Sequence, residues 1–216
     1  MVVPTGAFRR VGDRNCSVGI VLACPDMDAT RTTTVEWNTE LVEQLDWHWR
    51  TQLRARLDGL TDDEYRWEPV RGAWNVRPRG TATAPIAAGR GDYTIDFAIP
   101  EPDPAPVTTI AWRIGHLVVG VLGMRTAGHF DGPPMDYESH EYAGDAAGAL
   151  AQLDATYAAW TAGVRGLGKE GLRRPCGPAE GPYADAPMAA LVLHINREVI
   201  HHGAEIALLR DLYRWR

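Results

Sequence analysis

The amino-acid sequence predicts an all-α protein, a four-helix bundle with a small irregular or β insertion between the first and second long helices. Four long stretches carry apolar residues at helical spacing, and the loops between them are rich in glycine and proline. Only one short segment alternates like a strand. A chain of 216 residues is ample for one well-buried domain and short for two. We therefore expect one domain over residues 31–216.

The first long helix is expected over residues 34–57, and Gly59 ends it. A short helical turn follows, with Thr61 as its N-cap and Glu64 completing a capping box. The insertion then covers about residues 70–107. Within it, residues 93–97 alternate like a strand and are expected to pair near residues 74–77, so we predict at most two strands.

The other three long helices are expected over residues 110–127, 145–167 and 188–213. Thr108 or Thr109 is the N-cap of the second long helix. This helix is apolar nearly all round, which predicts burial on more than one side.

Composition excludes several classes of function. The formal charge of −6 and the pI near 5.6 argue against a nucleic-acid partner, which needs clustered positive charge. Three cysteines form no disulfide framework and favour a reducing, cytoplasmic location. No stretch has the ~20 apolar residues of a membrane-spanning helix. We expect neither a nucleic-acid nor a membrane partner.

Residues 1–30 differ from the rest and are expected to be an N-terminal extension, either disordered or produced by a start site annotated upstream of Met27. Three arginines precede a short apolar run at residues 18–24, which mimics a signal peptide with a lipoprotein-like cysteine. The run is at the short end for a signal peptide, so we favour the extension over secretion.

The last helix carries the strongest chemical signal. His194, Glu198 and His202 follow one another at spacings of four and so share one face. His202 falls near the middle of the apolar stripe with Glu198 on its flank, while His201 points about 100° away, towards solvent. Polar groups aimed into an apolar core need a partner, and a divalent metal accepts both imidazole nitrogen and carboxylate oxygen.

A third ligand has to come from another helix, and His116 lies in the apolar second helix. Two ligands four apart on one helix and one from a second helix are typical of catalytic zinc with one open position. The alternative is that each histidine is a satisfied core residue. Three roles fit His194: a metal ligand, a hydrogen-bond partner of a ligand, or a surface residue. Glu205 is a candidate for the group that orients His202.

Two further histidine groups carry less signal. We expect the first helix to bound the pocket near His48 and Trp49; His48 either faces this pocket or is structural. His129 and His140 follow the second helix, where solvated histidines are common.

Three blocks of sequence resemble the DinB superfamily, in particular the branch related to mycothiol-dependent maleylpyruvate isomerase. They are residues 56–69 (RLDGLTDDEYRWEP), residues 109–117 (TIAWRIGHL) and residues 196–206 (NREVIHHGAEI). The likeness covers residues 31–216 and implies a bundle of DinB type. It also implies a divalent metal, zinc first and nickel second, held by His116, Glu198 and His202.

The resemblance implies a metal-dependent enzyme that uses a low-molecular-weight thiol such as mycothiol, of S-transferase or isomerase type. Arg113 and His48 are the candidate catalytic residues: Arg113 would bind a carboxylate, or else form a salt bridge. The alternative is a non-catalytic metal- or ligand-binding helical bundle. We expect a small-molecule substrate and a homodimer. The isomerase has a further C-terminal domain, so its substrate is not carried over.

Overall fold

The structure, a computed structural model, describes residues 35–216, and the expectations for residues 1–30 lie outside this range. The described chain is mostly helical, with one small three-stranded sheet. No helix in these residues is long and apolar enough to cross a membrane.

The first long helical segment runs continuously from residue 37 to residue 57. It consists of α1 (Trp37–His48), a π-helical turn η1 (Trp49–Leu53) and a 3₁₀ turn η2 (Arg54–Leu57). The short helix α2 (Asp62–Tyr65) follows, and Thr61 caps it by accepting a hydrogen bond from the Glu64 backbone N–H.

The predicted capping box is only half formed, because the Glu64 carboxylate does not return to Thr61. It pairs instead with Arg210 near the C-terminus, with Nε–Oε1 at 2.7 Å and Nη2–Oε2 at 3.0 Å. Both side chains are buried, which the local pattern could not indicate.

The insertion contains three strands where at most two were predicted. These are β1 (Val76–Pro78), β2 (Ile86–Ala88) and β3 (Tyr93–Phe97), with β3 in the centre and antiparallel to both neighbours. Pairing of β1 with β3 was expected, and Val76 lies opposite Ile95. The strand β2 was missed because three residues, Ile-Ala-Ala, are too short to display an alternation.

The second long helical segment comprises α3 (Ile110–His116), a π-helical stretch η3 (Leu117–Gly123) and α4 (Met124–His129). Its N-cap is Thr109, one of the two predicted N-cap residues, which accepts a hydrogen bond from the Trp112 backbone N–H. The segment is buried on several sides, as its apolar composition predicted.

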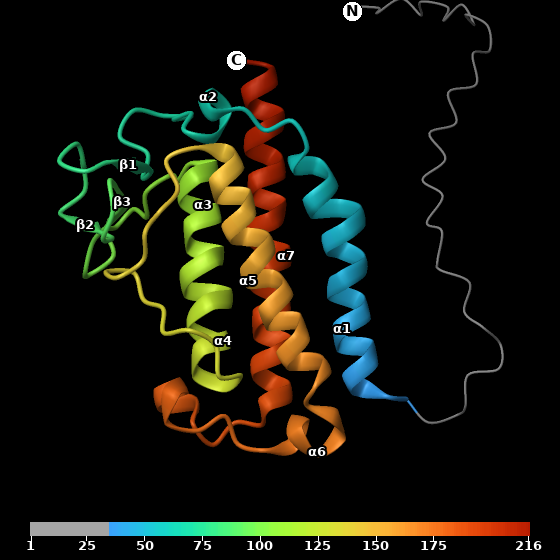
Figure 1. The fold of residues 1–216 in the computed structure, drawn as a ribbon. Coiled ribbons are helices and arrows are strands. Elements are labelled where there is room, and N and C mark those ends of the chain that lie inside the picture. The colour runs from blue at the N-terminus through green and yellow to red at the C-terminus, as the bar shows by residue number, and fades with distance from the viewer. Residues whose placement is uncertain (1–34) are drawn as a thin grey trace, which may run out of the picture. The chain divides into compact units, whose positions relative to one another are not determined.

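The remaining helices are α5 (Ala146–Arg165), α6 (Gly168–Arg173) and α7 (Met188–Arg214), with a 3₁₀ segment η4 (Pro178–Tyr183) between α6 and α7. Both α1 and α3 pack against α5 and α7. Figure 1 shows α5 and α7 between α1 on one side and α3–α4 with the sheet on the other. His116 on α3 and His202 on α7 meet where these two helices pack together.

Candidate metal centre

The histidines at the α3–α7 contact come close together. The rings of His116 and His202 meet edge to face, with centroids 4.8 Å apart. Glu198 lies one turn before His202, and its Oε2 is 3.5 Å from His202 Nε2. His202 is buried, while His116 and Glu198 are half-buried. The structure thus places His202 beside both of the other residues named by the sequence, His116 and Glu198.

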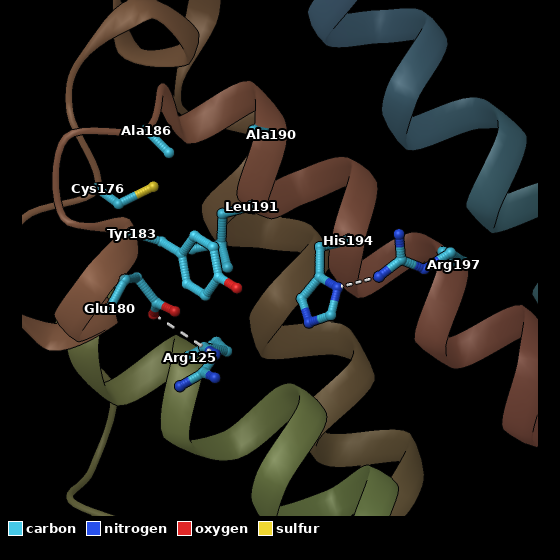
Figure 2. Close-up of a pocket in the computed structure, with 9 residues that line it drawn as sticks. All are labelled: Arg125, Cys176, Glu180, Tyr183, Ala186, Ala190, Leu191, His194 and Arg197. Atoms are coloured by element: carbon cyan, nitrogen blue, oxygen red, sulfur yellow. Dashed lines mark hydrogen bonds and ion pairs between the residues drawn. The ribbon is translucent and has the colours of Figure 1, made fainter.

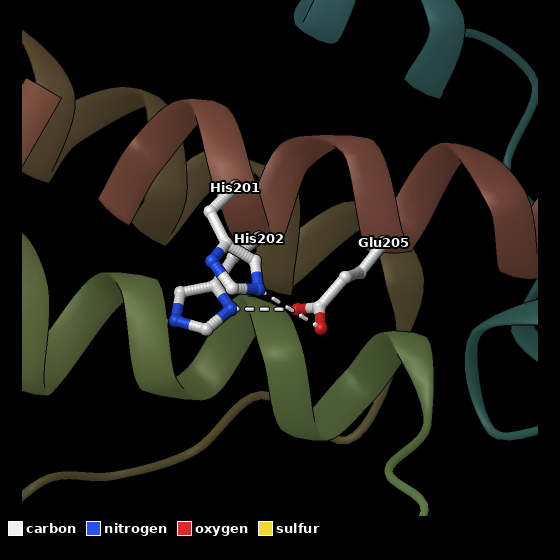
Figure 3. Close-up of side chains that lie close together, drawn as sticks. All are labelled: His201, His202 and Glu205. Carbon is white, nitrogen blue, oxygen red and sulfur yellow. Dashed lines mark hydrogen bonds and ion pairs between the residues drawn. The ribbon is translucent and has the colours of Figure 1, made fainter. Parts of the chain in front are cut away.

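The Nδ1 side of His202 is occupied by charged neighbours from both helices. Nδ1 lies 2.7 Å from Glu205 Oε2, a contact drawn in Figure 3. Arg113 Nη1 lies 3.0 Å from the same carboxylate oxygen and 3.1 Å from Nδ1. Nδ1 either donates to Glu205 or accepts from Arg113, and the Glu205 contact is the shorter, at 2.7 Å against 3.1 Å, so we assign Nδ1–H as the donor to Glu205. The lone pair of His202 then resides on Nε2, on the side of Glu198.

His116 is held in a comparable way by Tyr137, a residue that the sequence analysis missed. The Tyr137 hydroxyl lies 2.6 Å from His116 Nδ1, and the His116 ring stacks on Trp112 at 5.2 Å. A Cβ atom at position 120 would overlap the Tyr137 hydroxyl, so Gly120 provides the space for this contact. No residue in the described range forms a hydrogen bond with His116 Nε2.

Burial favours the neutral form of both imidazoles. Burial lowers the pKa of His116 to about 4, and the charges of His202 and Arg113 add to this effect. Burial also lowers the pKa of His202, although the hydrogen bond with Glu205 opposes it. Burial raises the pKa of Glu205, but its contacts with His202 and Arg113 outweigh this and lower it. Neutral imidazole is the form that binds a metal ion.

A second group of possible ligands shares His202. Ligand atoms of His201, His202 and Glu205 all lie within 4.8 Å of one another, so these residues form a candidate His/Glu metal site (Figure 3). His201 is exposed, as the helical period predicted, but it does not point away from the group: its Nε2 lies 3.2 Å from Glu205 Oε1. A four-residue spacing joins His201 to Glu205 just as it joins Glu198 to His202.

A cavity of about 460 Å³ opens beside His116 and His202. Residues of α3, the loop residue Tyr137 and the insertion line its remaining wall: Trp74, Phe97, Ala98, Ile99, Glu101, Trp112, Arg113 and Tyr137. We expected the first helix to bound this pocket near His48 and Trp49, and this is wrong. Trp49 stacks on Tyr157 of α5 at 3.7 Å, so it is directed into the α1–α5 contact.

The other histidines take different places. His48 is half-buried on α1, outside the residues that line this cavity, and burial lowers its pKa. His194 Nδ1 lies 3.6 Å from Glu198 Oε1, on the opposite side of that carboxylate from His202. His129 was expected to be solvated, but its side chain is buried and Nε2 contacts Glu180 Oε1 at 2.8 Å. His140 is half-buried and contacts Gln152.

A buried polar network fixes the insertion to the start of α3. Thr109 Oγ1 donates to Asn75 Oδ1 at 2.8 Å, and the Asn75 backbone N–H donates to Asp96 Oδ2 at 3.0 Å. Arg77 Nε donates to the same carboxylate at 2.8 Å, and Trp112 Nε1 donates to the Asp96 carbonyl at 2.8 Å. Asp96 Oδ1 finds no partner among the described residues, but these four hydrogen bonds tie the insertion to the start of α3. The aromatic wall of the cavity therefore has a fixed position relative to His116.

Comparison with known proteins identifies a family. The family model described as the DinB superfamily matches residues 44–206. No curated protein and no solved structure matches the chain.

Proposed function

Since the chain belongs to the DinB superfamily, we propose that it binds one divalent metal ion through His116, Glu198 and His202. We propose also that its four long helical segments form the four-helix bundle of DinB type. The observation that carries the metal proposal is the occupation of both Nδ1 atoms, by Glu205 on His202 and by Tyr137 on His116.

These Nδ1 contacts support Nε2 as the ligand atom of each histidine. Metal-binding histidines usually engage their other ring nitrogen with a carboxylate, carbonyl or similar partner, which fixes the tautomer and the ring orientation. The donor set of two neutral imidazoles and one carboxylate suits zinc, and nickel is the second candidate.

The rival group of His201, His202 and Glu205 is a poorer choice for the ion. Arg113 Nη1 lies 3.0 Å from the Glu205 carboxylate and 3.1 Å from His202 Nδ1, so its positive charge faces a cation placed there. An ion on the Nε2 side would have the His202 ring between itself and this contact, and Glu205 would neutralise the charge of Arg113.

We propose that the protein is a metal-dependent enzyme that uses a low-molecular-weight thiol such as mycothiol, of S-transferase or isomerase type. Bound at this site, a divalent ion would supply a Lewis acid that lowers the pKa of a thiol. The aromatic wall formed by Trp74, Phe97 and Trp112 would exclude water from the substrate.

Arg113 is the candidate for substrate binding. It lines the cavity, its Nη1 is held by Glu205, and its Nη2 makes no hydrogen bond within the described residues. A guanidinium held at one nitrogen is pre-oriented to bind a carboxylate of thiol or substrate with the other. His48 has no role in this mechanism, because it lies outside the cavity.

The alternative is a non-catalytic metal-binding protein. His194 is the observation behind it, because its Nδ1 lies 3.6 Å from Glu198 Oε1. A fourth protein ligand would close the coordination shell and leave no position for a substrate. The homodimer and the cytoplasmic location stay predictions.

Metal analysis of purified variants tests the site. We expect one ion per wild-type chain, and loss of stoichiometric metal in the His116→Ala/His202→Ala double variant and in Glu198→Ala. His201→Ala is the matched control and should keep the metal. Loss of metal in His201→Ala with retention in Glu198→Ala would assign the ion to the rival group.

Turnover of an electrophile, measured with mycothiol and with no thiol, tests the activity. Wild type should require the thiol, and Glu198→His should keep a metal but turn over more slowly, because a more positive site holds thiolate too tightly. Equal wild-type rates with and without thiol would refute the thiol mechanism.

A further inference from the structure

A second cavity, of about 350 Å³, lies between α4, the η4 segment and the first half of α7. Its volume is in the range of small-molecule pockets. Figure 2 shows its side chains: Arg125 comes from α4, Glu180 and Tyr183 come from η4, and His194 and Arg197 come from α7. The proposed metal ligands do not line it.

Arg125 is the unexplained residue of this cavity. Its guanidinium is largely buried, with 26% of the side chain exposed, yet it forms no hydrogen bond with any residue in the described range. Its nearest charged partner is Glu180, with Nε 3.5 Å from Oε1, and that carboxylate already contacts His129 at 2.8 Å. Buried polar groups are nearly always hydrogen-bonded, so this arginine points to a missing acceptor.

The charge and the lining define the acceptor. Arg197 is 67% exposed and pairs with Glu198 at 3.2 Å, and the Glu180 carboxylate is shared with His129. Arg125 therefore supplies the positive charge that lines the cavity without a hydrogen bond among the described residues. A single such charge suits a monoanion better than a phosphate dianion. The rest of the wall is apolar: Cys176, Tyr183, Ala186, Ala190 and Leu191. The planar guanidinium fork matches the geometry of a carboxylate.

We propose that this cavity binds a small organic carboxylate with an apolar body, its carboxylate on Arg125 and its body against Tyr183 and Leu191. Its wall residues His194 and Arg197 contact Glu198, but Arg125 does not, and the proposal does not depend on the function proposed for the metal centre.

Calorimetric titration of the full chain with benzoate tests the proposal. We expect saturable binding of one benzoate per chain at millimolar or lower concentration. Arg125→Gln should weaken it about 10- to 100-fold, the effect of losing a charge-assisted hydrogen-bonding group. Arg173→Gln removes the same charge from an exposed position outside the cavity and should change nothing. Benzamide, which has the same shape without the charge, should bind at least tenfold more weakly.

Three further arms make the test decisive. Ala190→Phe fills the cavity without altering its charge and should also abolish binding, so a folding defect in Arg125→Gln would not leave the question open. The His116→Ala/His202→Ala variant should bind benzoate as wild type does, and its failure to do so would place benzoate on the metal. Inorganic phosphate should not displace benzoate. No binding to wild type, binding unaffected by Arg125→Gln, or displacement by phosphate would each overturn the proposal.

Discussion

The buried pair of Glu64 and Arg210 joins α2 to the C-terminal part of α7, and its removal should be strongly destabilising. Each side chain is 5% exposed, and two parallel contacts of 2.7 and 3.0 Å form a fork. Arg210 also donates to the backbone carbonyls of Arg56 and Asp58. In Arg210→Met the carboxylate stays buried without its cation, which typically costs about 3–5 kcal/mol. For a chain of this size that corresponds to a fall in Tm of roughly 6–20 °C.

Urea unfolding followed by circular dichroism measures this loss, and the slope of the transition should stay unchanged. Arg56→Met is a matched control. Arg56 of η2 pairs with Asp211, the α7 residue that follows Arg210, but with 44% and 50% of the side chains exposed, so its loss should be about 0–1 kcal/mol. The double variant Glu64→Leu/Arg210→Met should regain at least half of the loss, since no unpaired charge remains. An Arg210→Met variant no less stable than Arg56→Met would refute the reasoning.

Two further predictions follow from single contacts. Tyr137→Phe removes the hydroxyl from His116 Nδ1 and should weaken zinc binding about 10- to 100-fold in a chelator competition, with the circular dichroism spectrum unchanged; an unaltered affinity would show that Tyr137 does not orient the ring. Burial lowers the pKa of His48, so below pH ~6.5 the unfolded chain takes up a proton that the folded chain does not. The free energy of unfolding therefore decreases as the pH decreases. His48→Gln should reduce the dependence of unfolding free energy on pH between about 6.5 and 5, and an unchanged dependence would contradict this account.

The helices were predictable because their signals are local. Thr109 caps α3 through a hydrogen bond to a residue three positions away, and apolar periodicity extends along α5 and α7. The same periodicity placed His202 and Glu198 on the inner side of α7 and singled out His116. Local spacing is information that a sequence displays directly.

The remaining features depend on contacts between distant residues. Glu64 meets Arg210 across 146 positions, and Tyr137 reaches His116 from a loop with no period of its own. The pocket wall could not be predicted either, because the position of the insertion depends on hydrogen bonds such as the one between Thr109 and Asn75. Hydrogen bonds of this kind leave no periodic trace in the sequence.

The π-helical stretch Leu117–Gly123 changes which residues of the second segment share a face. Nine positions separate His116 from Arg125, so a regular α-helix would direct them about 180° apart. A π-helix has roughly 4.4 residues per turn and rotates about 82° per residue, which reduces this angle to about 50°. Both side chains can then face α7, one in each cavity. If these seven residues rewound as a regular α-helix, α4 would turn by about 130° and carry Arg125 out of its cavity while His116 stayed in place. The wider turn thus sets the angle between the two side chains and allows one helical segment to contribute to two sites.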